Sequence, residues 1–244
     1  MQLAGKVAII TGVSQSGQVG FALASTFARE GARLTISSRS AERVAARAHE
    51  LQVSGATVLG VAADLTTEAG AQTLIQRTLE AYGRVDILVN LAGGLTTYGP
   101  FEELTLGDWE QELNNNLRTT FLCSRAVWPL MKQQGGGKIL NFSRAGDALA
   151  SGPNILAYNC AKAGVDALTA TLAREGKPHN ILVNALGPGL VATQSNLDEL
   201  APSEEEFRNR WVSREQIVEA ALFLVSSAGD GVNGIVLPVR GRGI

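Results

Sequence analysis

The sequence has little of several residue types that would restrict its function. Among 244 residues there are two cysteines, Cys123 and Cys160, which lie far apart and lack the spacing of a metal site. We therefore expect neither a disulfide framework nor a zinc centre, and both cysteines are predicted to be reduced thiols in the core. The acids between 198 and 206 are interpreted as the polar face and charged start of helices, so no metal is expected.

An excess of charge of one sign is also lacking, because 21 basic residues balance 23 acidic ones and leave a net charge of −2. This balance provides no basic patch for nucleic acid. The first apolar run, at 7–10, is too short for a signal sequence and much too short to cross a membrane. The sequence therefore predicts a soluble cytoplasmic protein that binds neither nucleic acid nor a membrane.

No linker, charge run or internal repeat divides the chain, and its length suffices for one large α/β domain. We predict a single domain over 1–244, in which short runs rich in Val, Ile and Leu alternate with longer helical patterns. The predicted strands are 6–11, 32–37, 56–62, 85–90, 138–143, 180–186 and 235–239. The predicted helices are 18–30, 41–53, 67–82, 108–133, 155–176 and 214–227.

This alternation predicts a doubly wound α/β fold of the Rossmann type, with a parallel seven-stranded sheet covered by helices on both faces. Ligands bind such sheets in the crevice beyond the carboxyl ends of the strands. Segment 190–213 interrupts the alternation with apolar residues among acids. It is predicted to be a mobile substrate lid over that crevice.

The strongest indication of chemistry is a Tyr-x-x-x-Lys pair formed by Tyr158 and Lys162 in the predicted helix 155–176. A spacing of four places the phenol and the ammonium on one face of a helix, about one turn apart. A nearby cation stabilises the phenolate, and so is predicted to lower the tyrosine pKa toward the range of a general acid or base. Taken alone, the pair is weak evidence, because a Tyr and a Lys four residues apart are commonly part of a solvated helix face.

Two further segments indicate a dinucleotide. A loop rich in glycine and hydroxyl residues, 11–20, follows the first strand and precedes a helix, which favours a bound pyrophosphate over a simple tight turn. The second strand ends in Ser38 and Arg39, where an NAD-specific site usually has an acid. A guanidinium there suits the 2′-phosphate of NADP, although a solvated arginine at the start of a helix is the alternative.

Together these residues resemble the short-chain dehydrogenase/reductase family over essentially the whole chain. The matching pieces are the loop at 11–20, Ala63-Asp64-Leu65, Asn90-Leu91-Ala92-Gly93, Asn116, Tyr158 with Lys162, the run 183–193 and the closing pattern 217–239. The resemblance implies that Tyr158 donates a proton to a carbonyl, that Lys162 holds the nicotinamide ribose, and that Asn116 anchors a water relay to Lys162.

The resemblance also implies where the cofactor lies and how the chain assembles. The expected cofactor contacts are Gly12, Ser14, Gln18, Val19, Ser38, Arg39, Asp64, Leu65, Asn90, Ala92, Gly93, Lys162, Pro188, Val191 and Thr193. A homotetramer is implied, and small residues on the helix from 155 permit close approach of helices at a two-fold interface. These small residues are Ala157, Cys160, Ala161, Ala163, Gly164 and Ala167.

Two departures from the family pattern affect the chemistry. Arg144 occupies the expected position of the catalytic serine, and Ser143 is one residue away, on the opposite face if 138–143 is a strand. We therefore take Ser143 as the candidate serine, with Arg144 as the alternative donor to a substrate oxyanion or carboxylate. The loop at 11–20 is also longer than usual and resembles that of enoyl reductases.

The sequence thus favours an NADP(H)-dependent oxidoreductase that interconverts a carbonyl and a secondary alcohol. Its predicted pocket is mostly apolar, which indicates an apolar or acyl-like small molecule. The predicted lining is Leu95, Tyr98, Phe101, Leu149, Ile155, Leu156 and Leu190. Two alternatives remain open: an enoyl-type reductase, and a catalytically weak dinucleotide-binding sensor or partner protein.

Overall fold

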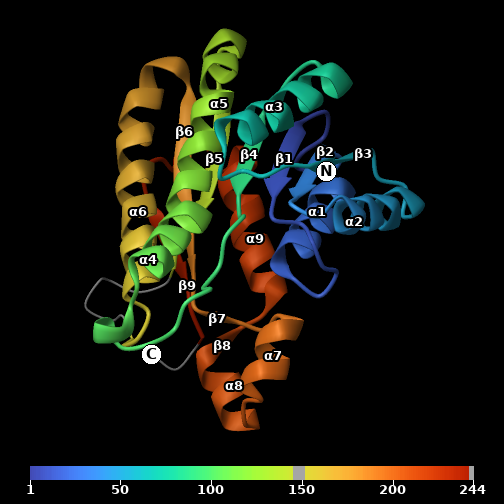
Figure 1. Cartoon of the computed structure of the whole chain (residues 1–244). Coiled ribbons are helices and arrows are strands. Elements are labelled where there is room, and N and C mark those ends of the chain that lie inside the picture. Colours follow the sequence, from blue (N-terminus) through green and yellow to red (C-terminus); the bar gives the residue numbers. More distant parts are fainter. Residues whose placement is uncertain (145–151, 242–244) are drawn as a thin grey trace.

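The computed structural model describes residues 1–144 and 152–241, and its centre is one parallel sheet of seven strands (Figure 1). The strand order is β3-β2-β1-β4-β5-β6-β9, which confirms the predicted doubly wound fold in a single domain. The strands are β1 Val7–Thr11, β2 Arg33–Ser38, β3 Val58–Ala62, β4 Ile87–Asn90, β5 Gly137–Phe142, β6 Ile181–Pro188 and β9 Val236–Val239.

Helices connect these strands and cover both faces of the sheet. They are α1 Val19–Arg29, α2 Ala41–Val53, α3 Glu68–Tyr82, α4 Leu106–Leu113, α5 Thr119–Gln134, α6 Leu156–Gly176 and α9 Arg214–Val225. The prediction of one continuous α-helix over 108–133 is wrong, because the segment is interrupted. A π-helical turn, η2 Asn114–Arg118, separates α4 from α5. Such turns widen the helix locally and are frequent at functional sites.

Each face of the sheet has its own apolar core, because buried parallel strands carry apolar side chains on both sides. Ala8 and Ile10 of β1 pack with side chains of α1, α2 and α9. Ile9, between them, belongs to the opposite core with α3, α5 and α6. The helices are therefore held at fixed positions over the carboxyl ends of the strands, where the loops converge.

Segment 190–213 is more regular than the predicted lid. It contains β7 Leu190–Val191, α7 Gln194–Leu200, α8 Glu204–Arg210 and β8 Trp211–Val212, which project together from one end of the molecule (Figure 1). β7 and β8 pair in parallel as a separate two-stranded sheet. Ser203 and Glu206 form a reciprocal capping box at the start of α8, which gives Glu206 a structural role.

Three further expectations concern cysteines, metals and membranes. Cys123 is buried as predicted, but the prediction for Cys160 is wrong, because Cys160 lies on the exposed face of α6. Over residues 1–144 and 152–241, no group of three or more His, Cys, Asp or Glu side chains is arranged to hold a metal ion. In the same ranges, no helix has the length and apolar character needed to cross a membrane.

Candidate active site

Tyr158 and Lys162 lie together on the first turns of α6, as the spacing of four requires. The Lys162 Nζ atom lies 5.5 Å from the centre of the Tyr158 ring. Lys162 is only 6% exposed, and its Nζ donates a hydrogen bond of 2.8 Å to the Phe142 carbonyl at the end of β5. The ammonium is therefore fixed between α6 and the sheet beside the phenol.

Burial dominates the titration of both groups. It raises the pKa of Tyr158 to about 12. Arg144 opposes this with a smaller lowering, and Glu112 adds a smaller raising. The lowered tyrosine pKa expected from the sequence is therefore wrong for the protein alone, because desolvation outweighs the lowering by Arg144. Burial also lowers the pKa of Lys162 to about 8, although Asp166 and Glu112 both oppose this.

Ser143 and Arg144, which follow β5, make different contacts. The Ser143 hydroxyl donates to the Lys162 carbonyl over 3.4 Å. Burial raises the pKa of the nearby Asp166 carboxyl, and a hydrogen bond from Ser143 partly offsets this rise. The hydroxyl of the candidate serine is thus engaged with α6. The Arg144 Nη1 donates to Asn159 Oδ1 at 2.7 Å, and Arg144 lines the same cavity as Tyr158.

Asn116 lies in the π-helical turn, where its side chain bridges two segments. Its Oδ1 accepts a hydrogen bond from the Gly94 N–H, and its Nδ2 donates to the Gly94 carbonyl, each over 3.0 Å. The same amide donates to Glu112 Oε2 at 2.9 Å. A side chain at Gly93, whose φ is +135°, would place its Cβ 2.6 Å from Asn116 Oδ1, so the segment needs glycine there.

Tyr158, Lys162, Ser143 and Arg144 line one cavity of 530 Å³ at the carboxyl ends of β4, β5 and β6, whereas Asn116 is in the lining of neither this cavity nor the second one described below. The predicted residues that the cavity brings together are Gln18, Val19, Gly93, Ser143, Tyr158, Lys162, Pro188, Val191 and Thr193. It also includes Arg144. The loop after β1 and the segment after β6 therefore meet at the cavity that Tyr158 lines, although they are distant in sequence.

Of the predicted apolar lining, Leu95, Ile155 and Leu190 face this cavity. The prediction for Tyr98, Phe101 and Leu156 is wrong, because none of the three is in the lining of this cavity. These three side chains are solvent-exposed, with Tyr98 at 70%. Leu149 falls outside the described residues. Leu91 also lines the cavity. Which side of the 95–101 loop faces inward depends on long-range contacts, which apolarity alone does not reveal.

A second cavity, of 400 Å³, adjoins the first and is lined from the ends of four strands. The predicted residues that line it are Gly12, Ser14, Ser38, Arg39, Asp64, Leu65, Ala92 and Gly93. Gly93, Gly94 and Leu95 line both cavities. Sequence reasoning missed Arg43, which also lines the second cavity. Its position one helical turn after Arg39 could have indicated it.

The backbone around these cavities fits a dinucleotide. Gly12 has φ +79°, and a Cβ there would lie 3.0 Å from the backbone of Ala92, so the two loops can approach each other only without a side chain. Within the described residues, no side chain caps the start of α1, and its first turn contains no acid. Its N–H groups and the positive end of its dipole are thus available to a phosphate.

The far end of the second cavity contains charges of both signs. Two hydrogen bonds from Thr66 lower the pKa of Asp64 most, with a further lowering by Arg39. Thr66 Oγ1 donates to Asp64 Oδ1 at 2.7 Å, and Ser38 Oγ donates to the Ser40 carbonyl at 2.9 Å. The carboxylate is therefore held within its own turn beside the arginine side chains.

Asn90 differs from its predicted place at the cofactor. It is buried, and its Nδ2 donates to Ser124 Oγ at 3.0 Å and to Asn141 Oδ1 at 2.9 Å. Neither of the two cavities includes Asn90 in its lining. Its side chain instead joins the end of β4 to α5 and β5, because successive side chains of a strand point to opposite faces of the sheet.

The segment after β6 contacts the glycine-rich loop directly. Gln18 Nε2 donates to Ser195 Oγ at 3.0 Å, and the Gln194 N–H donates to the Gly17 carbonyl at 3.1 Å. A Cβ on Gly17 would lie 2.8 Å from Gln194 Cβ. The start of α7 therefore closes against the loop that follows β1, above the two cavities.

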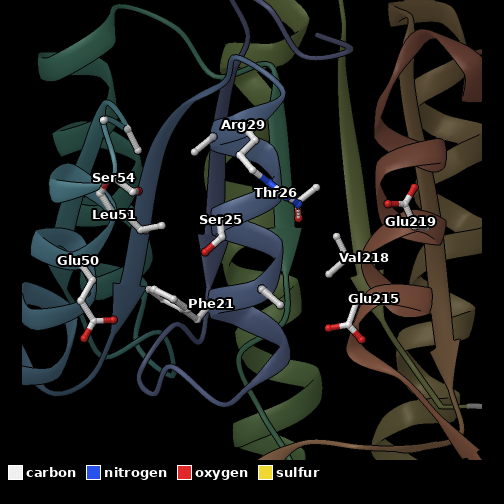
Figure 2. A pocket seen from close by; sticks show the side chains of 14 residues that line it. Phe21, Ser25, Thr26, Arg29, Glu50, Leu51, Ser54, Glu215, Val218 and Glu219 are labelled. Atoms are coloured by element: carbon white, nitrogen blue, oxygen red, sulfur yellow. Dashed lines mark hydrogen bonds between the residues drawn. The ribbon is translucent and has the colours of Figure 1, made fainter.

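A third, larger cavity of 690 Å³ lies between α1, α2 and α9, as Figure 2 shows. Ser25 and Arg29 of α1, Glu50 of α2 and Glu215 and Glu219 of α9 surround it. None of the predicted site residues is in its lining. Volume alone therefore does not identify the reactive site.

Comparison with known proteins agrees with this geometry. A family model described as short chain dehydrogenase matches residues 6–203, which include both loops and the Tyr158–Lys162 pair. The chain belongs to the short-chain dehydrogenase family. It is accordingly an oxidoreductase of a small molecule, and the family's cofactor is a nicotinamide dinucleotide. The expected family membership is confirmed.

Individual relatives match over almost the whole chain. A subunit of the (2S)-[(R)-hydroxy(phenyl)methyl]succinyl-CoA dehydrogenase of Thauera aromatica is 36% identical, covering 99% of this chain and 97% of its own. The 1,6-dihydroxycyclohexa-2,4-diene-1-carboxylate dehydrogenase of Pseudomonas putida is 37% identical, covering 97% and 92%. Among solved structures, a 7α-hydroxysteroid dehydrogenase complexed with NADH and 7-oxo glycochenodeoxycholic acid has a TM-score of 0.89 at 31% identity, covering 100% and 96%.

Proposed function

We propose that this short-chain dehydrogenase interconverts a carbonyl and a secondary alcohol on an apolar or acyl-like small molecule, with NADP(H) as cofactor. One observation carries the proposal. The Tyr158–Lys162 pair faces a cavity that shares the segment from Gly93 to Leu95 with a second cavity, which suits a dinucleotide. A substrate carbonyl could therefore lie between the phenol and the nicotinamide end of the cofactor.

The cofactor would be held by the loop after β1, by the ends of β2 and β3, and by Lys162 at the nicotinamide ribose; when bound, it supplies or accepts the hydride. Tyr158 manages the proton. Its hydroxyl gives a proton to the carbonyl oxygen during reduction and takes one from the alcohol during oxidation. Because burial raises its pKa to about 12, Tyr158 stays protonated at neutral pH, which suits the acid role.

Asn116 and segment 190–213 have supporting roles in this proposal. Asn116 lies in the turn that fixes the loop between the two cavities, and we assign it to a water relay toward Lys162. The start of α7, which contacts the glycine-rich loop through Gln194 and Ser195, acts as the lid over the nicotinamide end. Its closure would exclude water from the proton transfer.

The function is tested by turnover against paired substrates. We expect NADPH oxidation with apolar ketones, and NADP⁺ reduction with the matching alcohols. Enones serve as the discriminating substrates, because reduction of the carbon–carbon bond with the carbonyl intact would favour an enoyl-type reductase. Cofactor binding without turnover of any substrate would favour the sensor or partner protein.

NADPH is predicted to bind more tightly than NADH. Ser38, Arg39 and Arg43 line the far end of the second cavity, and a charge-assisted hydrogen bond to a 2′-phosphate is worth about 1.5–3 kcal/mol. Arg39→Ala should therefore weaken NADPH binding about 10- to 100-fold in calorimetry and leave NADH binding unchanged. The exposed Arg77→Ala variant is the control. Equal affinity of the unmodified protein for the two cofactors would contradict the assignment.

Arg144 is proposed to contact an anionic group of the substrate, since its guanidinium lines the catalytic cavity beside Tyr158. The Pseudomonas putida relative is, by its name, a dehydrogenase of a carboxylate. Arg144→Ser should raise KM for carboxylated substrates by about 10- to 100-fold and leave KM for neutral ketones unchanged. Arg77→Ser, on the exposed side of α3, is the control. Higher turnover of neutral ketones by Arg144→Ser would instead mean that the site lacks only a serine donor.

The chain is proposed to assemble as a homotetramer. A mainly apolar groove between α4, α5 and α6 includes Phe121, which is 44% exposed, and Gly164 and Ala167. Only part of the predicted small-residue set can take part, because Ala157 and Ala161 are buried within the subunit.

Light scattering should give a mass four times the 25.6 kDa of one chain. Phe121→Glu should produce smaller species, because it places a charge in an apolar contact. Val53→Glu, on the exposed end of α2, should have no effect on the mass. A monomeric parent protein at working concentration would contradict the tetramer.

A further inference from the structure

Glu112 is an unusual feature of the catalytic region, because its carboxylate is fully buried, at 0% exposure, on the last turn of α4. Burying a carboxylate is costly unless donors compensate for the lost water. No Lys, Arg or His within residues 1–144 and 152–241 forms an ion pair with it. Its stabilisation must come from hydrogen bonds.

Four donors supply them. Glu112 Oε1 accepts from the Thr96 and Thr97 backbone N–H groups and from Thr96 Oγ1, the last two over 2.7 Å. Glu112 Oε2 accepts from Asn116 Nδ2 at 2.9 Å. Three of these partners are N–H groups that can only donate, so an ionised carboxylate, which only accepts, matches the whole set.

These hydrogen bonds join three parts of the site. Thr96 and Thr97 follow the Gly93–Leu95 segment that lines both cavities, and the Asn116 side chain grips Gly94 from the other side. One carboxylate therefore holds the common wall of the two cavities twice, directly at Thr96 and Thr97 just after it and through Asn116 at Gly94 within it. The wall contains two glycines with positive φ, Gly93 and Gly94, and so has little stiffness of its own.

We propose that Glu112 is a positioning residue of this active site, whose buried carboxylate fixes the Asn116 amide and the wall between the cofactor and substrate cavities. The proposal rests on the carbonyl–alcohol function proposed above. Because Glu112 acts through Asn116 and the loop, it touches neither substrate nor cofactor, and its removal should alter both binding and turnover.

The charge of Glu112 also reaches the reactive pair. It raises the pKa of Tyr158 and that of Lys162, in each case less than burial changes them. Among the residues that the structure describes, Arg144 at the end of β5 and Asp166 on α6 also act on this pair. Removing the Glu112 charge therefore lowers the pKa of Tyr158. Alcohol oxidation needs the phenolate, so the rising limb of its pH–rate profile then moves to lower pH.

Glu112→Gln tests the proposal, because an amide cannot satisfy all four donors. Either its NH₂ group faces the NH₂ group of Asn116, or it faces the Thr96 and Thr97 N–H groups. Hydrogen exchange of segment 91–97 in the protein without cofactor should become about 10- to 100-fold faster. Turnover and NADPH affinity should both fall, and the oxidation limb should shift to lower pH.

Glu110→Gln, the same change on the exposed side of α4, should match the parent in every readout. Glu112→Asp keeps the charge but shortens the side chain, so it should speed exchange while retaining the parental pH profile. If Glu112→Gln does not fold, Thr96→Val removes the hydroxyl that donates to Glu112, together with its contact from the exposed Gln111 amide, and should speed exchange of 91–97 by about 3- to 10-fold.

Unchanged exchange of 91–97 in these variants would overturn the proposal, as would an unchanged pH limb in Glu112→Gln. A parent protein that turns over no carbonyl or alcohol would instead contradict the proposed function. In that case, exchange and cofactor affinity would still decide the role of Glu112.

Discussion

Tyr158→Phe is expected to lower turnover by about 10²–10⁴-fold, because it removes the proposed acid and keeps the ring. The phenol is half-buried beside Lys162, and the phenyl ring can occupy the same space without exposing the site. NADPH affinity should change little. Steady-state kinetics with calorimetry on the same preparation separates the two effects.

Tyr82→Phe is a suitable control for this substitution. Tyr82 is a part-buried phenol whose hydroxyl donates to the Leu34 carbonyl at 3.0 Å, away from both cavities. It should lose some stability and retain the parental turnover per folded molecule. Normal turnover by Tyr158→Phe on the preferred substrate would rule out Tyr158 as the proton donor.

Lys162→Met is expected to damage both steps, with about 10²–10³-fold lower turnover and weaker cofactor binding. The substitution keeps an unbranched side chain of similar length and removes the ammonium that lies beside Tyr158. It also leaves the buried Phe142 carbonyl without the 2.8 Å hydrogen bond that Lys162 donates. A variant that lost turnover and bound NADPH as tightly as the parent would contradict the proposed contact with the ribose.

The pH dependence of NADPH binding offers a further measurement on Lys162. Burial lowers the pKa of this lysine to about 8, so its charge is present below that pH and is lost as the pH rises through it. Affinity of the parent should fall over this range, because a neutral amine attracts the cofactor less. Lys162→Met should bind with little pH dependence there. Lys132, exposed at the end of α5, is the matched site for a control Lys→Met change.

The sheet and most of its helices could be predicted from the sequence because their signals are local. Strands such as β1 are buried on both faces, so they appear as continuous apolar runs between helical patterns. Parallel pairing then brings all the strand ends to one edge. This explains why Ser38 and Asp64, which are 26 positions apart, could be expected at one cavity.

The features that sequence reasoning missed depend on which side of a segment is covered. Glu112 has the composition of a surface acid in an amphipathic helix, and only the return of the 93–97 loop buries it. Tyr98 appears apolar enough to line a pocket but faces solvent. Cys160 and Ala161 are neighbours, yet one is exposed and the other buried, because a helix turns by about 100° per residue.

The sequence by itself determined the doubly wound fold, the family and the Tyr158–Lys162 pair, because periodicity and short spacings are set by backbone geometry. Tertiary structure alone decided the π-helical turn at Asn116, the pairing of β7 with β8, and the burial of the Glu112 carboxylate. The strand pairing and the burial of the carboxylate require contact between segments distant in the chain, and such contacts exist only after the layers have packed. The same packing raised the pKa of Tyr158 and lowered that of Lys162, because desolvation is a property of the folded site and not of the residues.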